Sequence, residues 1–420
     1  MKKQLSVFIL IILPAFGFNQ NIDYARKIID TLTTPYFGGR GAADLGEKKA
    51  ADFLKNEFKR NHLQAFNDTF FQHFRYNINT FPKEVSVSID GEKLEAGVDY
   101  LVEPYSSSVG GEFQLVWYNK KNIPSKKEFK KLVAMDFFQD KFIVIDDKEV
   151  DKNNEEFHKI KINSVGAAGI INLEDKKLTH YLSQTYNDYG ALRIMREKIT
   201  RKNRTIKVEI DQEFKRNFLS QNVIGYVKGE QYPDSFIIVS AHYDHLGKMG
   251  KTVYFPGAND NASGVAMLLS LAYHYVHKEV PQKTIVFMLF GAEEVGILGS
   301  KHYVENPLFP LENVNFVMNL DLLGTGSEGA TVVNATEFPS YFNKLDSINA
   351  IDSYLPTIKK RGKAANSDHY WFTEKGIPSF FLYTLGGITA YHDVEDISKT
   401  LPLTKFEDCF RLLRDFIDEL

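Results

Sequence analysis

The sequence contains only one cysteine, Cys409, among its 420 residues. A single cysteine cannot form an intrachain disulfide, so the fold must be held by its hydrophobic core, with bound metal as a further source of stability. Cys409 lies in an amphipathic C-terminal pattern at helical spacing and is expected to be a small, buried hydrophobic residue. The sequence also has no internal repeat and no low-complexity segment.

There is little net charge of either sign. The formal net charge is −3 and the isoelectric point is about 6.4. This balance argues against a general nucleic-acid binder or a membrane-surface binder. Lysines are concentrated between residues 120 and 131, where they are expected to form a solvated face. The hydrophobic fraction of 43% is enough for sizeable cores, and the length predicts two or three domains.

The N-terminus has no hydrophobic run long enough to cross a bilayer. Residues 5–13 are apolar apart from one serine, which is short for a span of about 20 residues. Lys2 and Lys3 precede this run, and the small residues Ala15 and Gly17 follow it. This pattern predicts a cleaved signal peptide over residues 1–19, and therefore an exported, periplasmic or secreted protein with no membrane anchor in its mature form.

Two parts of the chain differ in pattern. From Gln221 onward, strand, loop and helix patterns alternate, which predicts an α/β fold with a mixed, mainly parallel central sheet and helices on both faces. Residues 80–219 contain short strand patterns and no cluster of catalytic residue types. We therefore predict one catalytic domain, formed by residues 20–79 and 220–420, that is interrupted by an inserted β-rich domain over residues 80–219.

Metal-capable residues follow several hydrophobic runs directly. Such runs precede His242, the pair Glu293-Glu294, and Asp321, and a further run leads into Tyr391-His392. Asp260 lies in a Gly/Asn-rich loop that starts a helix. Because sites in open α/β sheets form at the carboxyl ends of strands, this arrangement predicts a hydrolytic two-metal centre.

Asp260 and Asp244 have different expected roles. In a two-metal site one carboxylate must bridge the ions, and Asp260 is the natural bridge, although helix capping alone also favours Asp at such a position. Asp244 lies two residues after His242, where strand geometry points both side chains the same way, so its carboxylate can hold the His242 ring. His245 is the weaker candidate ligand because the same geometry points it elsewhere.

The adjacent acids Glu293 and Glu294 would repel each other after a buried strand unless a cation or a proton relieves them. One of them can bind metal while its neighbour acts as a general base; the alternative is two solvated glutamates at a helix start. Asp321 has no capping role and needs a partner if it is buried. His392, taken alone, reads as an ordinary loop histidine.

Taken together, these motifs resemble the co-catalytic zinc exopeptidase family, peptidase family twenty-eight, which includes bacterial leucyl aminopeptidases, aminopeptidase Y and glutamate carboxypeptidase II. The resemblance covers roughly residues 22–75 and 218–420. It includes the segment Phe37-Gly38-Gly39-Arg40, the motif Ser367-Asp368-His369 and the segment Gly376-Ile377-Pro378. The inserted block resembles a protease-associated domain, especially at residues 141–146 and 166–171.

The resemblance implies a site with two zinc ions per chain. His242, Asp260 and Asp321 would hold one zinc, and Asp260, Glu294 and His392 the other. Glu293 would be the general base, Asp244 would orient His242, and Tyr391 would polarise the scissile carbonyl. The expected substrates are peptides.

Several functions fit this pattern, and the sequence favours an aminopeptidase. Acidic residues near the ligands can hold a free ammonium group, whereas a carboxypeptidase needs Arg or Lys for a terminal carboxylate. The basic residues Lys359, Lys360, Arg361 and Lys363 leave open a carboxypeptidase or an amidohydrolase of small acylated amino acids. A glutaminyl-cyclase-like acyltransferase and a non-catalytic binding protein are the alternatives of another class.

Overall fold

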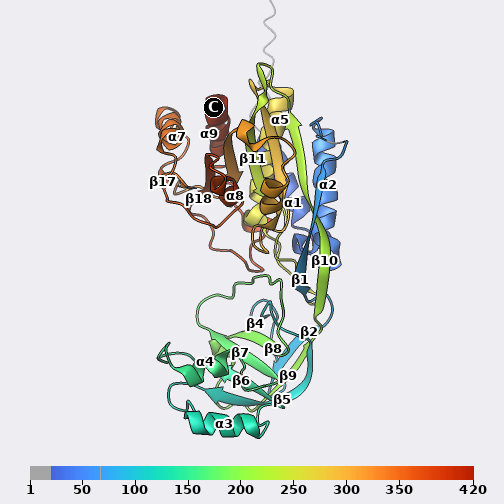
Figure 1. Ribbon diagram of the computed structural model, residues 1–420, viewed down its shortest axis with the longest axis vertical. Coiled ribbons are helices and arrows are strands. Elements are labelled where there is room, and N and C mark those ends of the chain that lie inside the picture. The colour runs from blue at the N-terminus through green and yellow to red at the C-terminus, as the bar shows by residue number, and fades with distance from the viewer. Residues whose placement is uncertain (1–19, 67) are drawn as a thin grey trace, which may run out of the picture.

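The computed structural model describes residues 20–66 and 68–420, so the predicted signal peptide, residues 1–19, lies outside the described residues. The molecule is elongated, with a larger α/β domain at one end and a smaller β-rich domain at the other (Figure 1). Each domain is built on its own eight-stranded sheet. No helix among the described residues is both long and apolar enough to cross a membrane.

The sheet of the larger domain is mixed, with a parallel centre. Its strands lie in the order β1 (Phe71–Thr80), β10 (Glu213–Val227), β14 (Lys283–Phe290), β11 (Tyr232–His242), β15 (Val314–Leu320), β18 (Ser379–Thr384), β16 (Ala330–Val333) and β17 (Ile358–Lys360). The pairs between β14, β11, β15 and β18 are parallel, and those that join β1, β10 and β14 are antiparallel. The carboxyl ends of the four central strands therefore meet at one edge, which confirms the predicted fold class.

Helices cover both faces of this sheet. Along β11, Ile237, Val239 and Ala241 pack into one core, while Phe236 and Ile238 pack into the core on the opposite face. Near-continuous hydrophobic strands are expected where a parallel sheet is buried on both sides. The helices that pack into the first core are α1 (Gln20–Leu32), α2 (Gly46–Arg60), α5 (Gly264–His277), α7 (Pro339–Asp352) and α9 (Phe406–Asp418). Those that pack into the core on the opposite face are α6 (Leu298–Glu305) and α8 (His369–Glu374).

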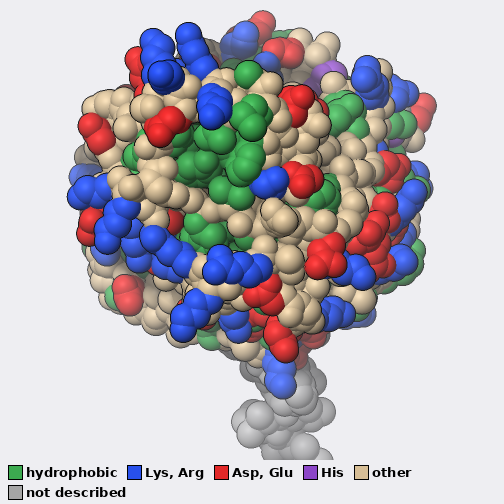
Figure 2. Space-filling model, turned by 90° about the horizontal axis from the view of Figure 1, so that it is seen from below, with side chains coloured by type: hydrophobic (Ala, Val, Ile, Leu, Met, Phe, Trp, Pro, Cys, Tyr) green, Lys and Arg blue, Asp and Glu red, His purple; other side chains and the backbone are tan. Residues whose placement is uncertain are grey.

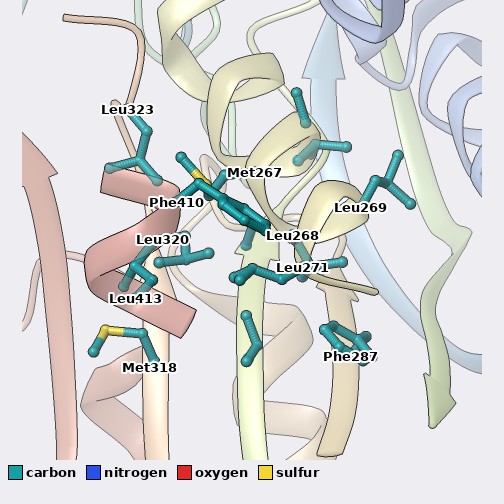
Figure 3. Packing of buried hydrophobic residues seen from close by; sticks show 14 of the residues in the cluster. Met267, Leu268, Leu269, Leu271, Phe287, Met318, Leu320, Leu323, Phe410 and Leu413 are labelled. Atoms are coloured by element: carbon teal, nitrogen blue, oxygen red, sulfur yellow. The ribbon is translucent and has the colours of Figure 1, made fainter. Parts of the chain in front are cut away.

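Helix α5 packs across the centre of the first core. Figure 3 shows its residues Met267, Leu268 and Leu271 against side chains from the strands and from α9. Its hydrophobic residues are buried almost all round, so the helix is fixed in position against β11 and β15. Cys409 of α9 is fully buried in the same core, as expected for a cysteine without a partner.

The second sheet is formed entirely by residues between 85 and 210. Its strands lie in the order β3 (Glu92–Lys93), β2 (Val85–Ile89), β9 (Thr205–Ile210), β5 (Val109–Tyr118), β6 (Lys141–Ile145), β7 (Gly169–Glu174), β8 (Gly190–Met195) and β4 (Tyr100–Val102). The helices α3 (Lys126–Ala134) and α4 (Glu155–Lys161) belong to the same domain (Figure 1). The predicted boundary between residues 219 and 220 falls inside β10, because β10 pairs with β1 of the first sheet from Glu213 onward.

The far end of the inserted domain is exposed to solvent. Helix α3 has no buried residue, and its lysines are exposed, in agreement with a solvated face. Figure 2, seen from this end, shows a cluster of hydrophobic side chains with lysine and arginine side chains around it. Val133, Met135 and Phe137, in and directly after α3, are among the exposed hydrophobic residues of this domain.

The two domains share part of a hydrophobic core. Leu246, Met249 and Phe255 follow β11 in the catalytic domain, yet they belong to the core cluster of the inserted domain. The backbone N–H of Gly250 also donates to Phe81 O at 2.7 Å. The loop between His242 and Asp260 is therefore held by both domains.

Candidate metal centre

The candidate ligands come together at the carboxyl edge of the parallel strands. His242 ends β11, Glu293 and Glu294 follow β14, and Asp321 follows β15. Asp260 precedes α5, and His392 lies in the loop after β18. The six side chains line one cavity of about 220 Å³. The predicted convergence of strand ends is thus what the structure shows.

The first group consists of His242, Asp260 and Asp321. His242 Nε2 lies 3.3 Å from Asp260 Oδ1 and 3.4 Å from Asp321 Oδ1. All three residues are buried, and Asp321 Oδ1 has no hydrogen-bond partner among the residues that the structure describes. A buried carboxylate oxygen without a partner is costly, and a cation would satisfy it. Imidazole nitrogen and carboxylate oxygen are the ligands that zinc takes, so the residues fit the metal.

The second group surrounds the other oxygen of Asp260. His392 Nε2 lies 3.1 Å from Asp260 Oδ2 and 3.2 Å from Glu294 Oε2. Because Oδ1 faces His242 and Oδ2 faces His392, Asp260 is shared by the two groups. This is the arrangement that a carboxylate bridging two metal ions requires.

His245 also belongs to the second group, contrary to the prediction that it points elsewhere. Its Nδ1 lies 2.6 Å from Glu294 Oε1 and 4.0 Å from Asp260 Oδ1. Strand β11 ends at His242, so the alternation of a strand does not extend to His245. His245, Asp260 and Glu294 form a second set that could hold a metal ion, together with the neighbouring His392.

Asp260 does not cap helix α5. The N–H of Gly264, the first residue of α5, is accepted by Asn261 Oδ1 at 2.9 Å. The carboxylate of Asp260 instead faces the two histidines. The capping alternative for Asp260 is therefore wrong, because Asn261 makes that contact.

The backbone around Asp260 is held from two sides. The buried guanidinium of Arg40 donates to the carbonyl oxygens of Tyr243 at 2.8 Å, Gly257 at 2.8 Å and Asp260 at 3.2 Å. Asp396 Oδ2 accepts the N–H of Asp260 at 2.9 Å. Buried polar groups must find such partners, and here they fix the bridging residue.

Asp244 holds the pair of glutamates. Its carboxylate accepts the N–H groups of Glu293 at 3.0 Å and Glu294 at 3.2 Å. His242 Nδ1 lies 3.2 Å from the backbone oxygen of Asp244 and 3.8 Å from its carboxylate oxygen Oδ1. Ala292, directly before the pair, has a φ of 55°, a conformation uncommon outside glycine. The two glutamates are thus directed to different places.

The pKa of Glu293 is shifted in the opposite direction from that of the candidate ligand Glu294. Burial, together with Asp368 and Glu294, raises the pKa of Glu293 well above its usual range despite the opposing effect of His242. Burial opposes the ionisation of Glu294 as well, yet His392 and His245 hold its pKa at about 2. Two adjacent carboxyls with opposite shifts are the pattern of a proton-transferring group beside a ligand.

In the metal-free centre, the two histidines that face Asp260 are stabilised in their protonated, charged form. Burial disfavours it, but Glu294 and Asp260 raise the pKa of His392 to about 11. Asp321 and Glu293 likewise outweigh burial and raise the pKa of His242 well above its usual value. A bound cation would take the place of these protons, since metal binding releases protons from its ligands.

Asp321 is positioned by a chain of buried side chains. Ser367 Oγ donates to Asp321 Oδ2 at 3.0 Å and accepts from Asn319 Nδ2 at 2.8 Å. Ser240 Oγ in turn donates to Asn319 Oδ1 at 2.8 Å. This chain links β11, β15 and the start of α8, so the motif at Ser367 supports a ligand.

Tyr391 and Arg361 complete the lining of the cavity. The Tyr391 ring stacks on that of His392 with the centroids 4.0 Å apart, and the residue is 43% exposed. Arg361 is exposed and lines the same cavity as Glu293. A larger cavity of about 1030 Å³ lies in the inserted domain and contains none of the candidate ligands.

The sequence predicted no role at the centre for Asp396 or His180, and it gave His245 only as the weaker candidate ligand. Asp396 was one of several acids after His392, and His180 carried no local signal. His180 lies in the inserted domain, and its carbonyl oxygen is 3.1 Å from His392 Nδ1. Such partners come from distant elements, which no spacing in the sequence records.

A mixed α/β sheet with two histidine–carboxylate groups that share one aspartate defines the class of two-metal hydrolytic centres. Residues 222–417 match the model of peptidase family M28. The match covers the part of the chain that carries all the candidate ligands.

Individual relatives are similar to a shorter part of the chain. The chain is 39% identical to Aminopeptidase YwaD of Bacillus subtilis (strain 168) over 171 residues, which are 39% of this chain and 35% of that protein. It is 39% identical to a probable zinc metalloprotease of Pyricularia oryzae over 112 residues, 26% of this chain and 22% of that protein. The match therefore spans about a third or less of the length of these relatives.

The fold is shared over a longer stretch. The zinc aminopeptidase BSAP from Bacillus subtilis aligns with a TM-score of 0.70 at 23% identity, over 94% of both chains. A peptidase M28 precursor from Shewanella amazonensis SB2B aligns with a TM-score of 0.68 at 18% identity, over 94% of this chain and 92% of that one. At such coverage the common fold includes the inserted domain.

Proposed function

We propose that this protein is an exported, zinc-dependent aminopeptidase that removes N-terminal residues from peptides. One observation carries the proposal: two groups of candidate ligands share Asp260, and Glu293 lines the same cavity with a raised pKa. The names of the relatives, an aminopeptidase and a zinc metalloprotease, support it. The predicted signal peptide supports export.

In the proposed centre each group of ligands holds one zinc ion. His242, Asp260 and Asp321 hold the first, and Asp260, Glu294 and His392 hold the second, with His245 against Glu294. When bound, the metal would supply Lewis acidity that activates water and polarises the scissile carbonyl.

The side chains of the protein supply the remaining steps. Glu293, which lines the cavity beside the candidate ligands, accepts a proton from the attacking water and returns it to the leaving amine. Asp244 holds the backbone of Glu293 in place for this transfer. Tyr391, exposed at the edge of the cavity, directs its hydroxyl to the carbonyl oxygen as charge develops there.

Zinc content and a pair of blocked peptides test the proposal. Purified protein should hold two zinc ions per chain by elemental analysis. An apolar N-terminal residue should be released from a C-terminally amidated peptide and not from its N-terminally acetylated counterpart. One zinc or fewer after zinc addition, or cleavage that ignores acetylation, would contradict the proposal.

Arg361 favours a second candidate, the cleavage of substrates that carry a free carboxylate. It is the one lysine or arginine among the described residues that line the cavity, and its guanidinium makes no ion pair or hydrogen bond among them. An arginine in this situation can bind a substrate carboxylate through two hydrogen bonds. Such a substrate is a carboxypeptidase substrate or an acylated amino acid.

The substitution Arg361→Gln separates the two candidates. If the protein is an aminopeptidase, kcat/KM for amidated peptides should change little in this variant. If a carboxylate is bound by Arg361, the variant should lose about 10-fold or more on free-acid substrates, since a charged hydrogen bond contributes about 1.5–3 kcal/mol. Lys359→Gln is the matched control, because Lys359 is exposed on β17, which ends directly before Arg361, and does not line the cavity.

A further inference from the structure

One segment of the inserted domain crosses to the metal centre. Residues 177–184, which we call the strap, connect β7 to β8 without regular structure. They contact the loop after β18 that carries His392 and the loop after β14 that carries Glu294. Both loops belong to the second group of ligands.

His180 and His392 form a reciprocal pair of contacts. The N–H of His180 donates to His392 O at 2.8 Å, and His392 Nδ1 lies 3.1 Å from His180 O. A carbonyl oxygen can only accept, so Nδ1 must carry a proton. This contact leaves Nε2 as the nitrogen that faces Asp260 and Glu294. Such a partner fixes the ring orientation and the tautomer of a metal-binding histidine.

The strap is anchored on both sides of His180. The Lys177 ammonium forms an ion pair with Asp393, the residue after His392, and donates to Thr389 O at 2.7 Å. The His180 ring stacks on Phe255 with the centroids 4.6 Å apart and the planes at 5°. These contacts hold the loop from 389 to 393 against the inserted domain.

The end of the strap reaches the other loop of the second group. Gln184 Nε2 donates to the carbonyl oxygen of Val295, the residue after Glu294, at 3.0 Å. Ser183 O accepts the N–H of Asn79 at 2.9 Å. The strap therefore contacts the residues that directly follow two ligands of the second group, His392 and Glu294.

The first group is supported differently. His242 Nδ1 is near the Asp244 carbonyl, and Asp321 accepts from Ser367, so both partners lie in the catalytic domain. No strap residue hydrogen-bonds to His242 or Asp321 among the described residues. The support of the two groups is thus divided between the domains.

We infer that the inserted domain is a positioning element of the second metal group and sets the zinc affinity of that group through the strap. Lys177 and His180 are positioning residues: they act on zinc through His392 and touch no reacting atom. The inference rests on the proposed two-zinc centre. The inserted domain, whose sequence shows no cluster of catalytic residue types, thereby contributes to the assembly of the centre.

Zinc affinity measured by chelator competition tests this inference on the full chain. Lys177→Met removes the ion pair and keeps the length of the side chain. It should weaken one of the two zinc ions by about 10–100-fold, the usual effect of losing a partner behind a ligand, and leave the other unchanged. Lys176→Met is the matched control, because the Lys176 side chain is exposed and makes no ion pair or hydrogen bond among the described residues.

Two further variants make the outcome decisive. His392→Ala should remove the same zinc that Lys177→Met weakens, and His180→Ala should weaken it by removing the stack on Phe255. If His180→Ala does not fold by circular dichroism, Lys177→Met decides alone. The inference is overturned if Lys177→Met matches Lys176→Met, or if both zinc ions weaken together. A wild-type chain that holds fewer than two zinc ions would instead overturn the proposed function.

Discussion

At the scale of single residues, the centre depends on carboxylates that differ in their partners. Asp244 accepts two backbone N–H groups and Glu294 pairs with two histidines, whereas the Glu293 carboxylate makes neither kind of contact within the described part of the chain. The same chemical group is thus fixed as a support, a ligand or a proton acceptor by what surrounds it. Burial and neighbouring charges push the pKa values of Glu293 and Glu294 in opposite directions.

Replacing the two glutamates separately should therefore have different effects. Glu293→Gln should lower kcat by about 10²–10⁴-fold or more while two zinc ions remain, because an amide cannot accept the proton. Glu294→Gln should lose one zinc, because the amide is a poor substitute for a charged ligand. Turnover of peptide and zinc content of each variant check this. A Glu293→Gln enzyme with most of its activity would show that the base is another residue.

At the scale of elements, the centre depends on close packing between a short N-terminal turn and the loop after β11. Gly39 has a φ of 65°, and a Cβ atom there would lie 2.4 Å from Gly247 O and 2.5 Å from Phe255 O. Only glycine permits this approach, which brings Arg40 into the backbone of the Asp260 loop. The turn therefore acts as a support for the bridging ligand.

Gly39→Ala should destabilise the protein more than an alanine at another glycine with positive φ. Gly376 has a φ of 80°, and a Cβ atom there would meet nothing within 4 Å. Gly376→Ala should cost about 1–2 kcal/mol for the backbone alone. Gly39→Ala adds the clash, which typically costs a further 1–3 kcal/mol or so. Urea denaturation of both variants measures the difference, and equal losses would mean that the close packing contributes nothing.

At the scale of the whole molecule, folding collects buried acids that repel one another when no metal is bound. Burial and Asp244 raise the pKa of Glu47 to about 8, and burial raises the pKa of Asp368 and Asp396 to about 7. Outside the centre, the domains are tied together through the strap and the shared core around Phe255. Bound zinc would therefore offset a cost that the fold carries in its absence.

Removing zinc should make stability depend strongly on pH. A carboxyl whose folded pKa is raised keeps its proton in the folded state after the unfolded chain has lost it, so stability falls as pH rises from about 4 to about 8. His392 acts in the same direction above about pH 6.5, since its pKa is raised to about 11. The lowered pKa of Glu294, about 2, contributes fully above about pH 5 and does not oppose this trend.

We therefore expect chelator-treated protein to unfold at a lower temperature at pH 8 than at pH 6. Protein in excess zinc should show a smaller change, because the cation lowers the cost of the ionised acids. A loss of 1 kcal/mol corresponds to about 2–4 °C for a domain of 150–250 residues. Differential scanning calorimetry at the two pH values, with and without zinc, measures this. A chelated protein that gains stability at pH 8 would contradict the expectation.

The sequence by itself predicted the fold class, a family resemblance and a set of candidate ligands, because these depend on local patterns. Hydrophobic runs of strand length end in His242, Glu293 and Asp321, and parallel strands of a sheet bring their carboxyl ends to one edge. Each motif spans only a few residues, so it can be recognised in the linear sequence. The repeat of strand, loop and helix from Gln221 onward likewise predicted helices on both faces of the sheet, where the two cores lie.

Only the tertiary structure decided how the ligands are held. Asp260 is a bridging candidate and not a helix cap because Asn261 makes the capping contact, and His245 turns to Glu294 because β11 ends before it. The support of His392 comes from His180, 212 residues away in another domain. Contacts between distant elements depend on how whole domains pack, and no periodicity or spacing in a single sequence encodes them.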